Sequence, residues 1–228
     1  MNHIHLSPER SFFERIKRIQ ALAEIGLEYN NSNYDQERYE EIQEICLEML
    51  EQLTNVPVNK ILPVIQEKNG YKTPKVDIRA VVFNPEGRIL LVQEKVDGCW
   101  SLPGGWADVG YTPAQIAEKE CYEEAGLTVK PSRLLAVLDK TAQQMPPEFE
   151  YVYKLFIRCE PIGYQISIGE ETLDVSWFDE NNLPELSKPR VIESQIHLMF
   201  EYFRSERTEV FLDLDELKYY RLKSECLK

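Results

Sequence analysis

The feature that most constrains this chain is a tight Pro-Gly-Gly turn at 103–105, followed by three glutamates on one predicted helix. Glu120, Glu123 and Glu124 stand at positions i, i+3 and i+4, where helical side chains are neighbours and like charges destabilise the helix. A cation placed among them would relieve this repulsion. Mg2+ prefers oxygen ligands and usually keeps part of its coordination for water and substrate phosphate. The run therefore predicts a helix that supports a divalent-metal site for a phosphate compound.

The ends of this helix can also be read from the sequence. Thr112, Pro113 and Gln115 form a capping box with proline at the first helical position, and Gly126 marks the C-terminal end. Gly104 lets the preceding loop bring backbone carbonyls near the same metal. Small apolar residues beside the carboxylates predict a face that packs closely on a sheet: they are Ala114, Ala117, Cys121 and Ala125.

Each feature alone has a simpler explanation, because acidic pairs are common on solvated helix faces and a Pro-Gly-Gly sequence marks only a turn. In this order the combination is far more specific, and it resembles the Nudix box. On this chain the box begins at Gly105 and ends with Gly126 and Leu127. Two positions depart from the family pattern, since Tyr111 replaces a glutamate and Lys119 replaces an arginine.

The resemblance implies that Glu120, Glu123, Glu124 and the carbonyl of Gly105 hold Mg2+ or Mn2+ ions across a diphosphate. In the family these metals neutralise phosphate charge and activate a water that attacks phosphorus. The two departing positions normally support the helix and orient the carboxylates. Loss of such outer groups typically costs about 10- to 100-fold, so the change predicts a slower enzyme rather than an inactive one.

Composition sets the wider limits. The 228 residues are 43% hydrophobic and 29% charged, which predicts a soluble globular protein with one good core and a small second unit. The net charge of −13 argues against an extended nucleic-acid surface. No membrane-length apolar run and no signal-peptide pattern is visible, so we expect a cytoplasmic protein without membrane association. The five cysteines form no Cys-x-x-Cys pair and suggest neither a zinc site nor a disulfide framework.

Hydrophobic periodicity divides the chain into a helical part and a sheet part. Two amphipathic helices are predicted between Glu14 and about Leu53, the first closing near Gly26, with a short helical stretch at 60–67 and a linker at 70–74. Two such helices cannot form a core alone and must pack on the second domain or on another subunit. Strands, and then a final helix, are expected at 76–83, 88–94, 134–138, 151–160, 175–178 and 191–204. This order predicts an α/β fold, a mixed-sheet α/β/α sandwich.

The whole arrangement is similar to a Nudix branch in which a small helical N-terminal domain precedes the hydrolase domain. The similarity rests on motifs such as Tyr34-Asp35, Glu37-Arg38-Tyr39 and the run from Thr73 to Ala80. It implies a helical domain at 1–70, a Nudix domain at 71–204 and an extension at 205–228. Members of the branch include pyrophosphatases for ADP-ribose and for CDP-choline and look like homodimers. In the extension, the run from Leu212 to Leu222 has the pattern of a short amphipathic helix.

Four further residues are candidates for the site. Arg79 is expected to contact substrate phosphate or ribose, the alternative being an arginine on the outer face of the sheet. Glu94 is a candidate for the nucleoside side, the alternative being a solvated charge pair with Lys95. Trp106 is a candidate aromatic wall for a base, as are Tyr71, Phe149 and Tyr151, the alternative for each being core or interface packing. Glu171 occupies the loop where relatives place a metal ligand or general base, with Glu170 and Asp174 as rivals.

Further candidates are weaker. The histidines at 3, 5 and 197 are not expected to be catalytic, and the loop at 139–147 is expected to influence specificity.

The sequence as a whole predicts a Mg2+-dependent Nudix pyrophosphohydrolase. The expected substrate is a small-molecule nucleotide, a nucleoside diphosphate linked to another moiety, cleaved to a nucleoside monophosphate and a phosphorylated product. Two alternatives remain open. One is a Nudix-fold binding or regulatory protein with weakened catalysis, favoured by Tyr111 and Lys119. The other is a house-cleaning nucleoside triphosphate hydrolase, which would release pyrophosphate.

Overall fold

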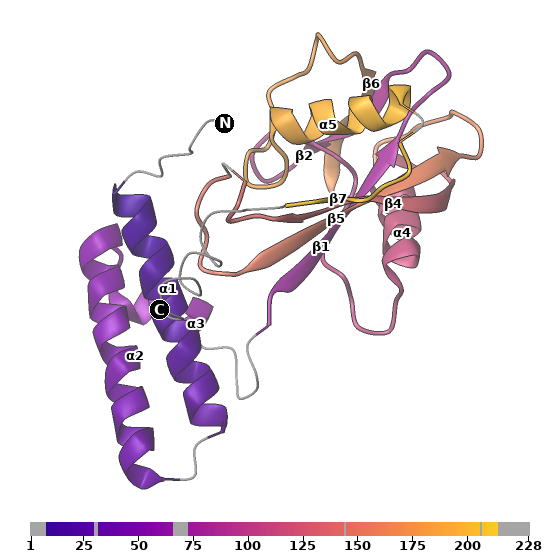
Figure 1. The fold of residues 1–228 in the computed structure, drawn as a ribbon. Helices are drawn as coiled ribbons and strands as arrows, with labels where there is room; N and C mark the ends of the chain where they lie inside the picture. Colours follow the sequence, from indigo (N-terminus) through magenta and orange to yellow (C-terminus); the bar gives the residue numbers. More distant parts are fainter. Residues whose placement is uncertain (1–7, 30–31, 66–72, 144, 206, 214–228) are drawn as a thin grey trace. The chain divides into compact units, whose positions relative to one another are not determined.

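The structure is a computed structural model that describes residues 8–29, 32–65, 73–143, 145–205 and 207–213 (Figure 1). The chain divides into two compact units. The first contains Met1–Pro74 together with Pro147–Glu150, and the second contains Lys75–Pro146 and Tyr151–Lys228. No helix in the described ranges combines the length and the apolar character needed to cross a membrane.

The first unit is helical. It contains α1 (Pro8–Glu28), α2 (Asn33–Thr54) and α3 (Val58–Ile65). Helix α1 continues past Gly26, which the sequence pattern placed at its end, because this glycine lies against α2: a side chain there would overlap the ring of Tyr39. The small core of the unit is formed by apolar side chains of all three helices: Phe13, Ile16, Cys46, Leu47, Leu50 and Ile61.

Residues 147–150 pack within the helical unit, although the chain on either side of them belongs to the second unit. Lys17 of α1 is buried and its ammonium donates to the backbone carbonyls of Glu148 and Glu150. The ring of Phe149 lies 5.4 Å from that of Phe13, centroid to centroid. These contacts give the segment both a polar and an apolar attachment to α1.

The second unit is a mixed α/β structure. Its elements follow in the order β1 (Lys75–Val82), β2 (Ile89–Glu94), β3 (Trp100–Ser101), α4 (Pro113–Ala125), β4 (Val129–Asp139), β5 (Val152–Pro161), β6 (Thr172–Phe178), α5 (Glu193–Arg204) and β7 (Phe211–Leu212). One sheet has the order β1-β5-β4-β7, and a second has the order β3-β2-β6. Strand β1 runs parallel to β5, whereas β4 and β5 are antiparallel, so the first sheet is mixed.

Strands β1 and β2 are buried on both faces, and their side chains alternate between two cores. Helix α4 contributes to one core and α5 to the other, and Figure 1 shows the two helices on opposite sides of the strands. The core on the α4 side includes Ile78, Ala80, Val82, Leu90 and Val92, and the core on the α5 side includes Val81, Phe83, Ile89 and Leu91. This layering confirms the predicted α/β/α sandwich.

Three details differ from the sequence prediction. Strand β4 begins at Val129, earlier than expected, because it follows α4 after a short connection. Ala114, predicted to lie on the packed face of α4, is exposed, whereas Ile116 is buried on that helix. Leu212, expected at the start of a helix, belongs to the short strand β7, which pairs in parallel with β4. Residues 214–222 of that predicted helix lie outside the described residues, as do residues 70–72 of the predicted linker.

The capping box of α4 is confirmed. The backbone N–H of Gln115 donates to Oγ1 of Thr112 at 3.3 Å, and the backbone N–H of Thr112 donates to Oε1 of Gln115 at 2.9 Å. Pro113 occupies the first turn, and Gly126 ends the helix in the left-handed conformation with φ of 61°. Both ends of the helix that carries the glutamates are therefore fixed locally.

We expect Thr112→Ala to lower the free energy of unfolding by about 1 kcal/mol, because it leaves an N-terminal amide of α4 without its side-chain acceptor. Urea unfolding followed by circular dichroism measures this change. Thr128→Ala, at an exposed position beyond the same helix, is the control and should stay within about 0.5 kcal/mol of wild type. An equal loss in both variants would contradict a specific capping effect.

Candidate active site

The loop before α4 lies against strand β1 through backbone hydrogen bonds. The N–H of Ile78 donates to the carbonyl of Gly105 at 2.8 Å, and the N–H of Ala80 donates to the carbonyl of Pro103 at 2.8 Å. Gly104 lies between these two contacts with φ of 154°, and a side chain at this position would overlap the carbonyl oxygen of Ile78. Only glycine allows this close approach. The carbonyl of Gly105, a predicted metal ligand, thus already accepts one hydrogen bond from β1.

Glu124 is the buried carboxylate of the site. It is 6% exposed, and its Oε2 accepts a hydrogen bond from the N–H of Gly104 at 2.9 Å. Burial raises the pKa of Glu124 from 4.5 to about 8, an effect opposed by the Gly104 hydrogen bond and by the charge of Arg79. A carboxyl group in this setting gains strongly from an added positive charge.

Glu120 and Glu123 share Lys119 as a counter-ion. The ammonium of Lys119 lies 2.9 Å from Oε2 of Glu123 and 3.7 Å from Oε1 of Glu120. Burial raises the pKa of Glu120, while Lys119 acts against that rise. The hydrogen bond to Glu123 in turn raises the pKa of Lys119. Lys119 therefore orients carboxylates at the position where the family pattern has an arginine.

A pocket of about 600 Å³ borders these carboxylates. The loop after β5 forms its other wall and is held to the end of α4, since the hydroxyl of Thr172 donates to the carbonyl of Glu124 at 2.9 Å. Glu171 is exposed in this wall, and its charge contributes to the raised pKa of Glu120. The lining consists of Glu120, Tyr122, Glu123, Glu124, Gly126, Ser167, Ile168, Gly169, Glu170 and Glu171. The predicted catalytic glutamates thus meet in one pocket.

The donor chemistry of this pocket fits a hard divalent cation. The pKa values of Glu120 and Glu124 are raised, which a cation would reverse, and oxygen ligands are what Mg2+ and Mn2+ prefer. Within the described residues, no three acidic, histidine or cysteine side chains are already gathered in a metal-binding arrangement. Glu123 is drawn to Lys119 and Glu124 to Gly104, so binding a cation would exchange these contacts for metal–oxygen bonds.

The predicted substrate residues occupy different settings. Arg79 is buried, with its guanidinium bonded to Asp77 and to the carbonyl of Leu102. Trp106 is 49% exposed, and the ammonium of Lys75 lies 5.7 Å from its ring centroid. Glu94 is buried, so the alternative of a solvated charge pair with Lys95 is wrong for this residue.

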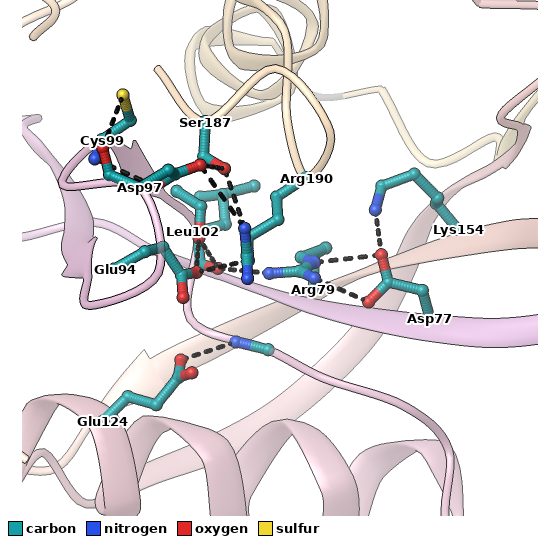
Figure 2. Close-up of polar contacts among 12 residues, drawn as sticks. Asp77, Arg79, Glu94, Asp97, Cys99, Leu102, Glu124, Lys154, Ser187 and Arg190 are labelled. Carbon is teal, nitrogen blue, oxygen red and sulfur yellow. Dashed lines mark hydrogen bonds and ion pairs between the residues drawn. The ribbon is translucent and has the colours of Figure 1, made fainter. Parts of the chain in front are cut away.

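Sequence reasoning missed the residues that hold Glu94. Its Oε1 accepts the hydroxyl of Ser101 at 2.6 Å and lies 3.1 Å from Nε of Arg190. Figure 2 shows Arg190 reaching from the loop before α5 toward Glu94. Arg190 lies in a loop without a periodic or spacing signal, and only its place in the folded chain brings it to the site.

Other candidates lie elsewhere. His197 on α5 is 3.2 Å from Glu180 and 3.4 Å from Glu193, which fits its exclusion as a catalyst, while the histidines at 3 and 5 lie outside the described residues. The described cysteines at 46, 99, 121 and 159 are free thiols, as the sequence suggested. Cys226 lies outside the described residues.

Comparison with known sequence families decides the classification. The family described as "NUDIX domain" matches residues 73–199, more than half of the chain. The chain belongs to the Nudix family of hydrolases. Nudix hydrolases generally use divalent metal ions, in agreement with the carboxylates of α4. The family described as "UDP-X-like, N-terminal oligomerisation domain" matches residues 10–65 and confirms the expected Nudix branch with a helical N-terminal domain.

Individual Nudix proteins support the same branch. The chain is 40% identical over 205 residues to a "Putative ADP-ribose pyrophosphatase YjhB" of Bacillus subtilis, covering 90% of this chain and 98% of that protein. A crystal structure titled "UDP-X diphosphatase" is 32% identical, with a TM-score of 0.57, and covers 90% of this chain and 99% of that one. An ADP-ribose pyrophosphatase structure from Streptococcus suis is 40% identical with a TM-score of 0.55, over 62% of this chain and 100% of that chain.

The two departures from the Nudix box yield a direct prediction. We expect the double substitution Tyr111→Glu with Lys119→Arg to raise kcat, because a bidentate guanidinium orients carboxylates better than an ammonium and a carboxylate returns at position 111. Steady-state kinetics with a compound that the wild-type enzyme turns over measures the change. Arg88→Lys, which alters an exposed arginine paired with Asp179, is the control. An unchanged kcat in the double variant would contradict the outer-group explanation.

The raised pKa of Glu124 predicts the pH dependence of the metal-free protein. Glu124 loses its proton near pH 8 in the folded state but near its ordinary pKa of 4.5 in the unfolded state. Between these values the folded state binds more protons, so this group makes the protein less stable as pH rises from about 4.5 to about 8. Glu124→Gln should remove this loss and be more stable than wild type at pH 8.

The measurement is the urea midpoint of chelator-treated protein between pH 5 and pH 9, compared between wild type and variant. Glu118→Gln, at an exposed position on the same helix, is the matched control. If the difference between wild type and Glu124→Gln did not change with pH, the raised pKa of Glu124 would be wrong.

Proposed function

We propose that this Nudix hydrolase is a Mg2+-dependent pyrophosphatase for a nucleoside diphosphate linked to another moiety, of the ADP-ribose or CDP-choline type. The observation that carries the proposal is the buried carboxylate of Glu124, held by Gly104 beside Glu120 and the pocket. Mn2+ is the second candidate metal. The names of the Bacillus subtilis and Streptococcus suis relatives support ADP-ribose as the first substrate to test.

Each residue has a proposed role in this reaction. Glu120, Glu123, Glu124 and the Gly105 carbonyl would hold the metal, which supplies positive charge to the diphosphate and acidifies a water. Lys119 keeps Glu123 directed along the pocket side of α4. Glu171, exposed across the pocket, is the candidate general base, and its position leaves it accessible to water.

The substrate side is proposed from exposure and chemistry. Trp106 presents a half-exposed aromatic face at the edge of β1, where a base or a sugar would stack in competition with Lys75. Glu94 is proposed to act on the substrate side through its neighbours, because its buried carboxylate is occupied by Ser101 and Arg190. Its role is therefore to shape the site rather than to meet the nucleoside first.

We also propose that the helical domain at 1–70 makes a homodimer, that the Nudix domain spans 71–204, and that 205–228 is an extension. The family match described as an oligomerisation domain supports the first point. Exposed apolar side chains on the long helices support it further, because such groups are usually covered in an assembly: they include Phe12, Ile19, Leu22 and Ile45.

The two alternative functions are disfavoured by specific observations. A weakened binding protein would be expected from loss of the arginine in the box, but Lys119 still contacts both Glu120 and Glu123. A nucleoside triphosphate hydrolase is less consistent with the Bacillus subtilis relative and the UDP-X diphosphatase structure, whose names refer to ADP-ribose and UDP-X compounds.

The test is a substrate panel with Mg2+ or Mn2+. We expect turnover of ADP-ribose, CDP-choline or a nucleotide sugar into two monophosphate products, measured as phosphate released by a coupled phosphatase. The double substitution Glu123→Gln with Glu124→Gln should reduce kcat by at least about 100-fold, because it removes two charged metal ligands. Glu118→Gln on the same helix is the matched control.

The products separate the alternatives. Release of pyrophosphate from nucleoside triphosphates alone would identify the house-cleaning activity. Nucleotide binding without turnover of any compound would identify the binding protein. Turnover that persists in the double variant would place the reaction outside this carboxylate cluster.

A further inference from the structure

A row of charged side chains extends from β5 across β1 to the end of β2 (Figure 2). Lys154 of β5 contacts Asp77 of β1, and Asp77 also binds Arg79 two residues later on the same face of the strand. Beyond Arg79, Glu94 at the end of β2 is paired with Arg190. Lys154 is 1% exposed, and Asp77 and Arg79 are 4% and 5% exposed, whereas Arg190 is partly exposed.

All three guanidinium nitrogens of Arg79 contact protein groups. Its Nε donates to Oδ2 of Asp77 at 3.1 Å, and its Nη2 lies 2.9 Å from Oδ1 of the same carboxylate. The remaining terminal nitrogen, Nη1, donates to the carbonyl of Leu102 at 3.1 Å. Each of the three guanidinium nitrogens therefore already has a partner, and one partner belongs to the loop that leads into Gly104.

The charges of the row also balance without a ligand. Arg79, Arg190 and Lys154 face the carboxylates of Asp77, Glu94 and Asp97, the last of which lies 3.6 Å from Arg190. Burial lowers the pKa of Lys154 to about 7. With Lys154 charged the row is neutral, and with Lys154 uncharged it is negative. In neither state does the row offer net positive charge to a phosphate.

We propose that Arg79 is a positioning residue, whose guanidinium, fixed by Asp77, holds the Leu102 carbonyl and so sets the Gly104 N–H toward Glu124. This role replaces the expected contact of Arg79 with substrate phosphate, and it rests on the proposed metal site at Glu124. The anchor matters because Gly104 follows Leu102 by only two residues, so a shift of one moves the other.

The same loop has a second anchor. The hydroxyl of Ser101 donates to Glu94 at 2.6 Å, and Glu94 is in turn held by Arg190 from the loop before α5. Arg190 is fixed by the hydroxyl of Ser187, which accepts a hydrogen bond from its Nη1 at 3.1 Å. The segment is thus held at Ser101 by Glu94, at Leu102 by Arg79 and at Gly104 by Glu124. The two arginines act on it from different elements.

The experiment compares Arg79→Lys with wild type in four readouts. They are Mn2+ affinity by electron paramagnetic resonance, kcat and KM at saturating Mn2+, and the hydrogen exchange rate of the Gly104 amide by NMR. A lysine keeps the positive charge but cannot bind Asp77 and Leu102 together. We expect Mn2+ affinity and kcat to fall about 10- to 100-fold, faster exchange at Gly104, and a KM within about threefold of wild type.

Two further variants keep the test sharp. Arg88→Lys, which alters an exposed arginine of the second unit, is the matched control and should equal wild type in all four readouts. Ser101→Ala removes a single hydroxyl and the second anchor, and serves where Arg79→Lys does not fold. We expect it to weaken Mn2+ binding about 2- to 10-fold and to speed exchange at Gly104, the effect of one lost hydrogen bond.

The outcomes separate this proposal from the proposed function. A rise in KM with unchanged Mn2+ affinity and unchanged Gly104 exchange would overturn it and make Arg79 a substrate ligand. If wild type turns over no substrate but Gly104 exchanges faster in Arg79→Lys, the positioning role is supported and the proposed function fails. Unchanged exchange in both Arg79→Lys and Ser101→Ala would overturn the positioning role whatever the activity.

Discussion

The hydrogen bond from the Gly104 N–H to Glu124 is the interaction on which the rest of the site depends. It requires the loop to pass so close to β1 that no side chain fits at position 104. It also requires α4 to present a carboxylate from its buried side, since Glu124 is only 6% exposed. Burial then raises the pKa of that carboxylate, so the geometry that fixes Glu124 also makes it a group that gains from a cation.

The sandwich supplies the rigid frame for this bond. Strand β1 is buried on both faces, and its backbone holds the loop through the N–H groups of Ile78 and Ala80. Helix α4 packs on one face through small residues such as Ala117 and Cys121, which let the helix axis come close to the strands. Loop and helix are therefore positioned by the same strand, which limits the relative movement of Gly104 and Glu124.

The parts of this site that sequence predicts well are the local ones. The capping box at Thr112, the end at Gly126 and the spacing of the glutamates all depend on residues within one helix, and the structure bears out both helix ends. The contacts that prediction missed join distant segments. The sequence left open a solvated Glu94, whereas the folded chain buries this residue and pairs it with Arg190. The sequence predicted a helix from Leu212, whereas Leu212 pairs with strand β4. No pattern along the chain predicts either contact, because each forms only when the strands and loops have come together.

The arrangement of charge suggests why catalysis would need a cation rather than the arginines. Arg79 and Arg190 are each committed to carboxylates of the protein, so they cannot neutralise an incoming diphosphate without breaking buried ion pairs. Lys119 contacts Glu120 and Glu123, the Gly104 amide donates to Glu124, and burial disfavours the charged forms of Glu120 and Glu124. An anionic substrate approaching this acidic pocket would be repelled. A divalent ion held by these carboxylates would address both problems, because it would stabilise their charged forms and would offer positive charge to the diphosphate.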